Sequence, residues 1–196
     1  MRQLPRKDDD DSGMPDSISL EPKANGLAGL ADTPELARLT DTVVAQWRRG
    51  DIFDDLAKYR IFPIRNVFMF GPPGNGKTTA CQVLASKIGC PLYRVRCECL
   101  RGIYLGETAR LMRAAMDFLA NAGRCVVLFD EVECIFPSRE GMDGQSGSQE
   151  VSSAMTVFWQ MLDRWTTPQL FCFATNMPEK LDPALLSRFE LKLEFG

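Results

Sequence analysis

The 196-residue sequence contains no histidine. This absence excludes a histidine general base and any nucleophilic triad built on one, and it removes the commonest nitrogen ligand of zinc. The seven cysteines are an odd number scattered along the chain, and the closest pair, Cys97 and Cys99, is separated by one residue. That spacing is too short for a zinc clip. We therefore expect reduced, buried thiols rather than a disulfide framework.

Long apolar runs and a dominant charge of one sign are also missing. No run approaches the roughly 20 apolar residues that span a bilayer, and the N-terminus lacks the apolar segment of a secretory signal. We expect a cytoplasmic protein with no membrane association. The net charge of -3 provides no basic field and does not favour nucleic acid as the main partner. With 45% hydrophobic and 25% charged residues, the chain can bury one full α/β core.

A glycine-rich stretch carries the first chemical signal. Residues 71–78 read GPPGNGKT and match the pattern G-x-x-x-x-G-K-[ST]. The apolar run 67–70 precedes them and a helical pattern follows, which predicts strand, loop and helix in that order. In such a loop the main-chain N–H groups and the helix N-terminus bind phosphate, Lys77 reaches the outer phosphates, and Thr78 binds Mg²⁺. The predicted nucleotide-binding residues are Gly71, Pro72, Pro73, Gly74, Asn75, Gly76, Lys77, Thr78 and Thr79.

A second signal is the apolar run 125–129, which ends abruptly in Asp130 and Glu131. This pattern is typical of a central parallel strand whose C-terminal end opens into a ligand-binding crevice. Asp130 is then placed to hold Mg²⁺, and Glu131 to polarise a water for attack on the γ-phosphate. The alternative is an ordinary acidic helix start after a buried strand. The phosphate loop upstream favours the nucleotide site.

These two motifs, together with Ala-Thr-Asn at 174–176 and LDPALLSRF at 181–189, resemble those of the AAA+ ATPase family from about residue 51 onward. The resemblance identifies the motifs as Walker A and Walker B and implies ATP and Mg²⁺ as cofactors. It implies that Asn176 helps to orient the attacking water, although Asn also favours simple strand-end turns. It implies that Arg188 is an arginine finger acting on a neighbouring subunit, with a helix-end cation as the alternative. The chain lacks the first of the two arginines that many members carry there.

The segment between the two nucleotide motifs narrows the resemblance. Residues 100–108, LRGIYLGET, are similar to a segment of the spastin and katanin protein-remodelling subgroup. That similarity implies that Tyr104 and Leu105 line the central pore of a hexamer and grip a polypeptide substrate. A tyrosine can stack on almost any passing sequence. The alternative is that Tyr104 packs as core beneath a helix predicted over 108–121.

The family resemblance also implies a fold. We expect an α/β P-loop NTPase of three layers, with a five-stranded parallel sheet in the order 5-1-4-3-2 and the phosphate-loop strand beside the strand that carries Asp130. Residues 1–24 are expected to be a disordered acidic arm. Residues 25–196 are expected to form the nucleotide-binding core, without the family's C-terminal helical lid. Within the core the patterns predict helices over 33–49, 51–59 and 151–165, and a polar loop over 138–149.

Two functions remain open at this point. The first is an ATPase that forms a ring, a hexamer when the lid is present, and remodels, unfolds or disassembles a protein substrate. The second is a nucleotide-dependent switch or assembly factor, including a DNA-related one, that does not move polypeptide. The presence of Lys77, Asp130, Glu131 and Asn176 favours hydrolysis over a dead scaffold. Tyr104 favours a protein substrate over DNA.

Overall fold

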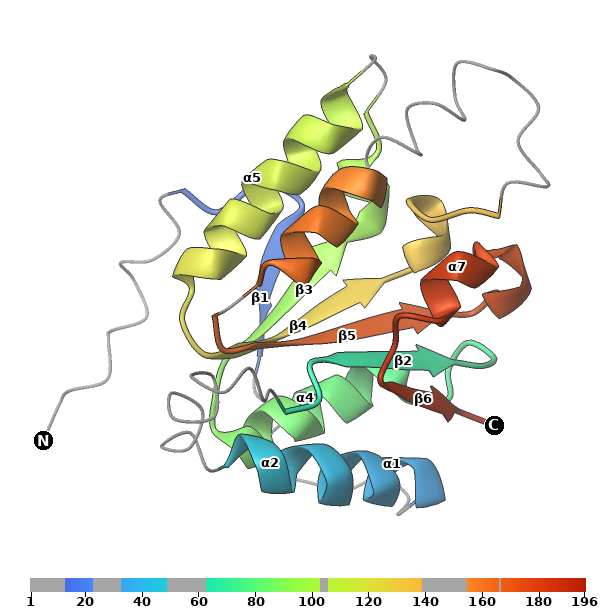
Figure 1. Cartoon of the computed structure of the whole chain (residues 1–196). Coiled ribbons are helices and arrows are strands. Elements are labelled where there is room, and N and C mark those ends of the chain that lie inside the picture. The colour runs from blue at the N-terminus through green and yellow to red at the C-terminus, as the bar shows by residue number, and fades with distance from the viewer. Residues whose placement is uncertain (1–12, 23–32, 49–62, 103–105, 139–154, 166) are drawn as a thin grey trace, which may run out of the picture.

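The computed structural model describes residues 13–22, 33–48, 63–102, 106–138, 155–165 and 167–196. Their centre is a six-stranded sheet in the order β1-β3-β4-β5-β2-β6 (Figure 1). Neighbouring strands from β3 to β6 are parallel, and β1 is antiparallel to β3. The strands are β1 (Ile18–Glu21), β2 (Asn66–Phe70), β3 (Leu92–Arg96), β4 (Cys125–Asp130), β5 (Gln169–Thr175) and β6 (Leu191–Glu194).

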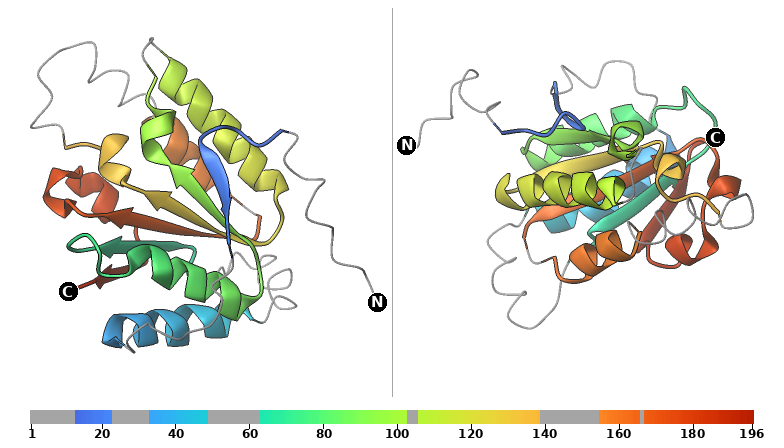
Figure 2. Two further views of the ribbon diagram at one scale, coloured as in Figure 1. Left: turned by 180° about the vertical axis from the view of Figure 1, so that it is seen from behind. Right: turned by 90° about the horizontal axis from the view of Figure 1, so that it is seen from above.

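Helices cover both faces of this sheet, which confirms the predicted three-layer sandwich (Figures 1 and 2). On one face lie α4 (Lys77–Ile88) and the helical stretch that contains α1 and α2. On the other lie α5 (Glu107–Asn121), the helical residues 155–163 and α7 (Pro183–Leu186). Short 3-10 turns follow several strands: η2 (Cys97–Leu100), η3 (Val132–Cys134) and η5 (Pro178–Lys180). In the described part of the chain, no helix combines the length and apolar character needed to cross a membrane.

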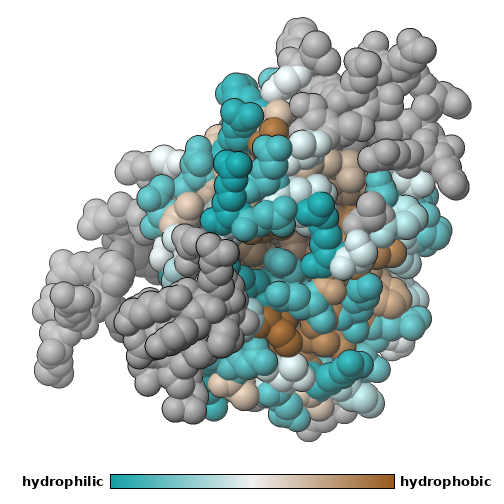
Figure 3. All heavy atoms as spheres, viewed as in Figure 1, coloured by the Kyte–Doolittle hydropathy of each residue, from teal (hydrophilic) through white to brown (hydrophobic). Residues whose placement is uncertain are grey.

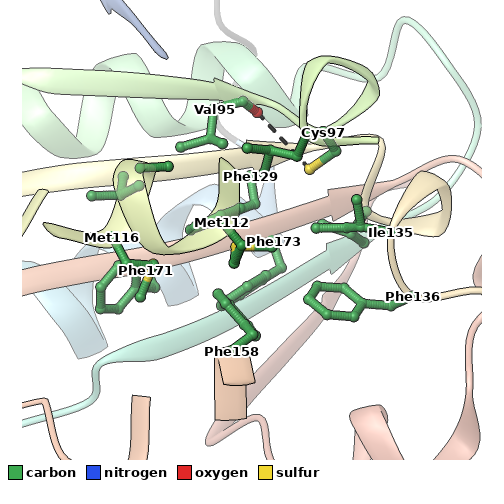
Figure 4. Close-up of a cluster of buried hydrophobic side chains, with 14 of the residues drawn as sticks. Val95, Cys97, Met112, Met116, Phe129, Ile135, Phe136, Phe158, Phe171 and Phe173 are labelled. Carbon is green, nitrogen blue, oxygen red and sulfur yellow. Dashed lines mark hydrogen bonds between the residues drawn. The ribbon is translucent and has the colours of Figure 1, made fainter. Parts of the chain in front are cut away.

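The central strands are buried on both sides because they read as continuous apolar runs. In β4, Val126 and Leu128 belong to the cluster on the α4 side, whereas Val127 and Phe129 belong to the cluster on the α5 side. Figure 4 shows the second cluster, where Phe129 stacks on Phe173 with ring centroids 5.2 Å apart. The described part of the face in Figure 3 is mainly hydrophilic. Because β3, β4, β5, β2 and β6 are parallel, their C-terminal ends emerge at the same edge of the sheet.

The first helical stretch begins where the sequence predicts. The Thr33 hydroxyl accepts a 3.2 Å hydrogen bond from Leu36 N–H and caps the helix. The stretch runs through α1 (Pro34–Leu39), the π-helical η1 (Thr40–Val44) and α2 (Ala45–Trp47). The expected helix over 51–59 lies outside the described residues, as do residues 139–149 of the expected loop and residues 151–154 of the last predicted helix.

The five expected parallel strands occur in the expected order, as β6-β2-β5-β4-β3. The sixth strand, β1, is a correction, because it lies in the segment expected to be disordered. Ile18 pairs with Val95 and is buried, and Arg96 N–H donates a 2.8 Å hydrogen bond to Ser17 O. Without β1, β3 would be an open sheet edge, and covering such an edge satisfies its backbone groups. The acidic run from Asp8 to Asp11 lies outside the described residues.

A second correction concerns the neighbours of the phosphate-loop strand. The strand before the loop is β2, and it pairs with β5 and β6 rather than with β4. The strand β5 lies between β2 and β4, and its end carries Asn176. The expectation that the phosphate loop follows a strand adjacent to Asp130 was therefore wrong, because the order 5-1-4-3-2 itself inserts one strand between them.

Five of the seven cysteines are small buried hydrophobes, as expected, whereas Cys134 is half-buried and Cys99 is exposed. None of the seven forms a disulfide, and the buried ones are Cys81, Cys90, Cys97, Cys125 and Cys172. Burial raises the pKa of the Cys125 thiol to about 12. A thiol with so high a pKa is protonated and unreactive at neutral pH. These residues therefore contribute packing to the core.

Candidate nucleotide-binding site

The phosphate loop connects the C-terminal end of β2 to the first turn of α4. Its glycines take left-handed backbone conformations, with φ of 84° at Gly74 and 85° at Gly76. Gly76 is the N-cap of α4 and, as a glycine, provides no side-chain cap for the first turn of that helix. The first N–H groups of α4 thus lack a side-chain cap, and the positive end of the helix dipole points the same way. A loop of this form suits a phosphate group.

Glycine is required at position 71 for a different structural reason. A Cβ atom at this position would lie 2.0 Å from the carbonyl oxygen of Phe195. This distance is too short for any residue other than glycine. Asn75 Nδ2 donates a 3.2 Å hydrogen bond to the same oxygen. The chain after β6 therefore packs directly against the phosphate loop. Sequence patterns carry no signal for this contact of Phe195, because it joins residues more than a hundred positions apart.

Lys77 is buried at the start of α4. Its Nζ donates hydrogen bonds of 2.7 Å to Gly71 O and 2.8 Å to Pro72 O. Burial lowers the pKa of Lys77, and the carboxylates of Asp130 and Glu133 oppose part of that shift. The ammonium group is therefore held inside the loop and near the acids that follow β4. Thr78 and Thr79 come next in the same turn and are half-buried.

Asp130 ends β4 and Glu131 directly follows it. Asp130 is held at both carboxylate oxygens: Oδ1 accepts from Glu131 N–H at 3.1 Å, and Oδ2 accepts from Arg94 Nη2 at 2.6 Å. The role of Arg94 was not predicted from the sequence. Arg94 pairs with Leu128 in the β3–β4 register, and Leu128 belongs to the cluster on the α4 side of the sheet. Among the described non-glycine residues, Glu131 alone has a positive φ, of 55°. Such a conformation is uncommon and tends to mark functional sites.

Asn176 directly follows β5 and is half-buried. Since β5 lies between β2 and β4, Asn176 emerges between the phosphate loop and the pair Asp130 and Glu131. The strand order thus brings three sequence motifs to one edge of the sheet.

The described residues fit a magnesium nucleotide. Mg²⁺ prefers oxygen ligands and in nucleotide sites keeps several waters and phosphate oxygens. The Thr78 hydroxyl and the Asp130 carboxylate supply hard oxygen donors on adjoining parts of the site. Within the described ranges, no group of three or more His, Cys, Asp or Glu side chains forms an all-protein metal cage. The donor set is that of a cation held mainly by its nucleotide.

Arg188 lies after α7 rather than in the phosphate loop region. Its guanidinium lies 4.7 Å from the ring centroid of Trp159, and its Nη1 is 3.4 Å from Asp163 Oδ2. Both partners are on the helical segment 155–163, and the Arg188 side chain remains 45% exposed. Tyr104 and Leu105, the expected pore residues, lie outside the described residues.

The fold and this site define a P-loop nucleotide-binding domain of the α/β class. The chain belongs to the AAA family, the ATPase family associated with various cellular activities, whose model matches residues 67–196. The matched part includes the phosphate loop, Asp130, Glu131, Asn176 and Arg188.

Individual relatives agree with this assignment. A probable 26S proteasome regulatory subunit 10B of Caenorhabditis elegans is 30% identical over the whole chain and 48% of its own length. The 26S proteasome regulatory subunit 7 of Dictyostelium discoideum is 36% identical over 69% of the chain and 32% of its own length. An uncharacterized AAA family ATPase, y4kL, of Sinorhizobium fredii is 29% identical over 92% of the chain and 59% of its length.

Among solved structures, the FIGL-1 AAA domain in complex with ADP superposes with a TM-score of 0.69 and 24% identity, covering 92% of this chain and 58% of that one. This likeness supports the fold. The chain spans about half the length of the first curated relative it matches.

Proposed function

We propose that this chain binds ATP with Mg²⁺, hydrolyses it, and works in a ring of copies that remodels a protein substrate. The observation that carries the proposal is that the segments following β2, β4 and β5 meet at one edge of the sheet. They carry Lys77 at the start of α4, Asp130 and Glu131 at the end of β4, and Asn176 directly after β5. A phosphate-binding cation, a metal-binding carboxylate, a base and a polar residue that orients water are the parts a phosphoryl transfer needs.

Each residue then has one task. The N–H groups of the phosphate loop and the first turn of α4 bind the phosphates, and Lys77 turns its Nζ from the loop carbonyls to the outer phosphates. Thr78 and Asp130 would hold the Mg²⁺, which would supply positive charge beside the phosphates. Glu131 accepts a proton from the attacking water, and Asn176 orients that water. The exposed position of Glu131 leaves its carboxylate accessible to solvent.

The ring is supported by the family and by the position of Arg188. Its guanidinium is partly exposed and is held by an aromatic face and by Asp163, itself 69% exposed, so little free energy opposes its transfer to another partner. The curated relatives include subunits of a proteasome, which is a multi-subunit protein assembly. We propose a hexameric ring in the cytoplasm, where the seven cysteines, none of them in a disulfide, stay reduced.

If Arg188 acts across a subunit boundary, Arg188→Ala should bind ATP normally but hydrolyse it roughly 10³-fold or more slowly. Mixing Arg188→Ala with Lys77→Ala should restore phosphate release, because the first variant supplies an intact nucleotide site and the second an intact finger. The measurement is the steady-state rate of each variant alone and of the mixture at several protein concentrations. Arg113→Ala, which removes an exposed arginine of α5, is the control. Full activity of Arg188→Ala alone would exclude the finger role.

The remodelling step is tested at Tyr104. If Tyr104 grips polypeptide, Tyr104→Ala should leave ATP affinity and basal hydrolysis unchanged and abolish stimulation by an unfolded protein. If it packs as core, the truncation should cost about 3 to 5 kcal/mol of stability and lower activity with it. Thermal melting and ATPase assays with and without unfolded casein separate the two. A variant with unchanged stability and unchanged stimulation would count against both roles of Tyr104.

A further inference from the structure

A hydrogen-bonded link joins the ends of β4 and β5 beside the nucleotide site. The Thr175 hydroxyl donates to Glu133 Oε2 at 2.6 Å, a short distance of the kind found when the acceptor is charged. The same hydroxyl oxygen accepts from Met177 N–H at 2.9 Å. Thr175 is 1% exposed and Glu133 is half-buried. Both bonds are therefore largely shielded from competing water.

The bonds fix the backbone on both sides of Asn176. A hydroxyl has one proton, so donation to Glu133 leaves its oxygen lone pairs for Met177 N–H. The bond from Met177 to Thr175 closes a tight turn that has Asn176 at its centre. The carboxylate of Glu133 thereby orients the Thr175 hydroxyl and favours the turn that orients Asn176.

On its other side the link reaches Glu131. Glu133 belongs to η3, which starts directly after Glu131, and Cys134 N–H donates a 3.0 Å hydrogen bond to Glu131 O. The backbone of Glu131 is the N-cap of this turn and has its left-handed conformation there. One short path of contacts therefore connects the backbone of the proposed base to the backbone of the proposed water-orienting residue.

We infer that Glu133 is a positioning residue for ATP hydrolysis. Through the Thr175 hydroxyl it keeps Asn176 in a fixed position relative to Glu131. The inference rests on the proposed function. In this role Glu133 acts through Thr175. Its carboxylate also partly offsets the lowering of the Lys77 pKa by burial, so ATP affinity is measured beside turnover. Because a displacement of about 1 Å at a reacting centre can cost about 10²-fold in rate, loss of the link should appear in turnover rather than in binding.

The test compares four substitutions by their turnover, ATP affinity and melting temperature. Glu133→Ala and Thr175→Val should each lower kcat by about tenfold to a hundredfold, with the Kd for a fluorescent ATP analogue changed less than about twofold. Thr175→Ser keeps the hydroxyl and should retain near-normal kcat. Glu133→Gln keeps an acceptor without the charge and should fall between Glu133→Ala and the unsubstituted protein.

The decisive comparison uses Asn176→Ala as background. If Glu133 acts through Asn176, adding Glu133→Ala to Asn176→Ala should lower kcat no further, since coupled residues are not additive. Two results would overturn the inference: an equal fold-loss in both backgrounds, or a parallel fall of melting temperature and nucleotide affinity, which marks a merely structural link. Absence of turnover in the unsubstituted protein would instead refute the proposed function, so the two failures are distinguishable.

Discussion

Replacing Lys77 by alanine is expected to weaken equilibrium binding of ATP by about tenfold to a hundredfold. A hydrogen bond to a charged group contributes about 1.5 to 3 kcal/mol, and a factor of ten in affinity corresponds to about 1.4 kcal/mol. Lys77 supplies such bonds from a buried position where water screens them weakly. Alanine keeps the helix start and leaves the loop glycines unchanged. Titration with a fluorescent ATP analogue measures the effect.

The matched control is Lys87→Ala, which removes a lysine from the last turn of the same helix α4. Its backbone oxygen accepts a hydrogen bond from Arg48 Nε, and that bond survives the substitution. We expect unchanged ATP affinity in this variant and a melting temperature close to that of the unsubstituted protein. Equal affinities of Lys77→Ala and Lys87→Ala would mean that the loop does not bind nucleotide through Lys77.

Replacing Glu131 by glutamine should separate binding from hydrolysis. We expect ATP affinity to be retained while turnover falls by about 10² to 10⁴-fold, the usual contribution of a positioned general base. Glutamine keeps the shape of the side chain and the backbone N–H that donates to Asp130 Oδ1. Metal and phosphate binding should therefore survive. The measurements are single-turnover phosphate release and equilibrium titration on the same preparation.

Glu179→Gln is the control for this substitution, because it neutralises an exposed carboxylate in η5 and leaves the site untouched. It should hydrolyse ATP at the normal rate. If folded Glu131→Gln turned over ATP as fast as Glu179→Gln, the base would have to be another group. If folded Glu131→Gln failed to bind ATP, the role of Glu131 as a base that is not needed for binding would be wrong.

The nucleotide motifs were predictable because each is local. The phosphate loop is one run of eight residues, and its order of strand, loop and helix follows from apolar spacing and glycines alone. Asp130 and Glu131 end an apolar run of the kind typical of a central parallel strand, and β4 is buried along that run. The strand order came from the family resemblance, since spacing cannot decide which parallel strands are neighbours.

The contacts that tune the site were not predictable, because they join distant residues. Arg94 meets Asp130 from another strand, Thr175 meets Glu133 across 42 positions, and Phe195 faces Gly71 across the loop. None of these pairs leaves a periodic pattern. The strand β1 was missed for another reason: its four residues follow a strongly acidic segment, and composition averaged over that segment hid the local preference for pairing with β3.

The most direct test of magnesium-dependent ATP hydrolysis at this site is phosphate release from ATP by the unsubstituted chain, titrated with Mg²⁺ and repeated with EDTA. The site predicts release that rises with Mg²⁺ to a plateau, stops when the metal is chelated, and is lost in Lys77→Ala and Glu131→Gln. Release that ignores Mg²⁺, or that continues at the same rate in both variants, would contradict the account.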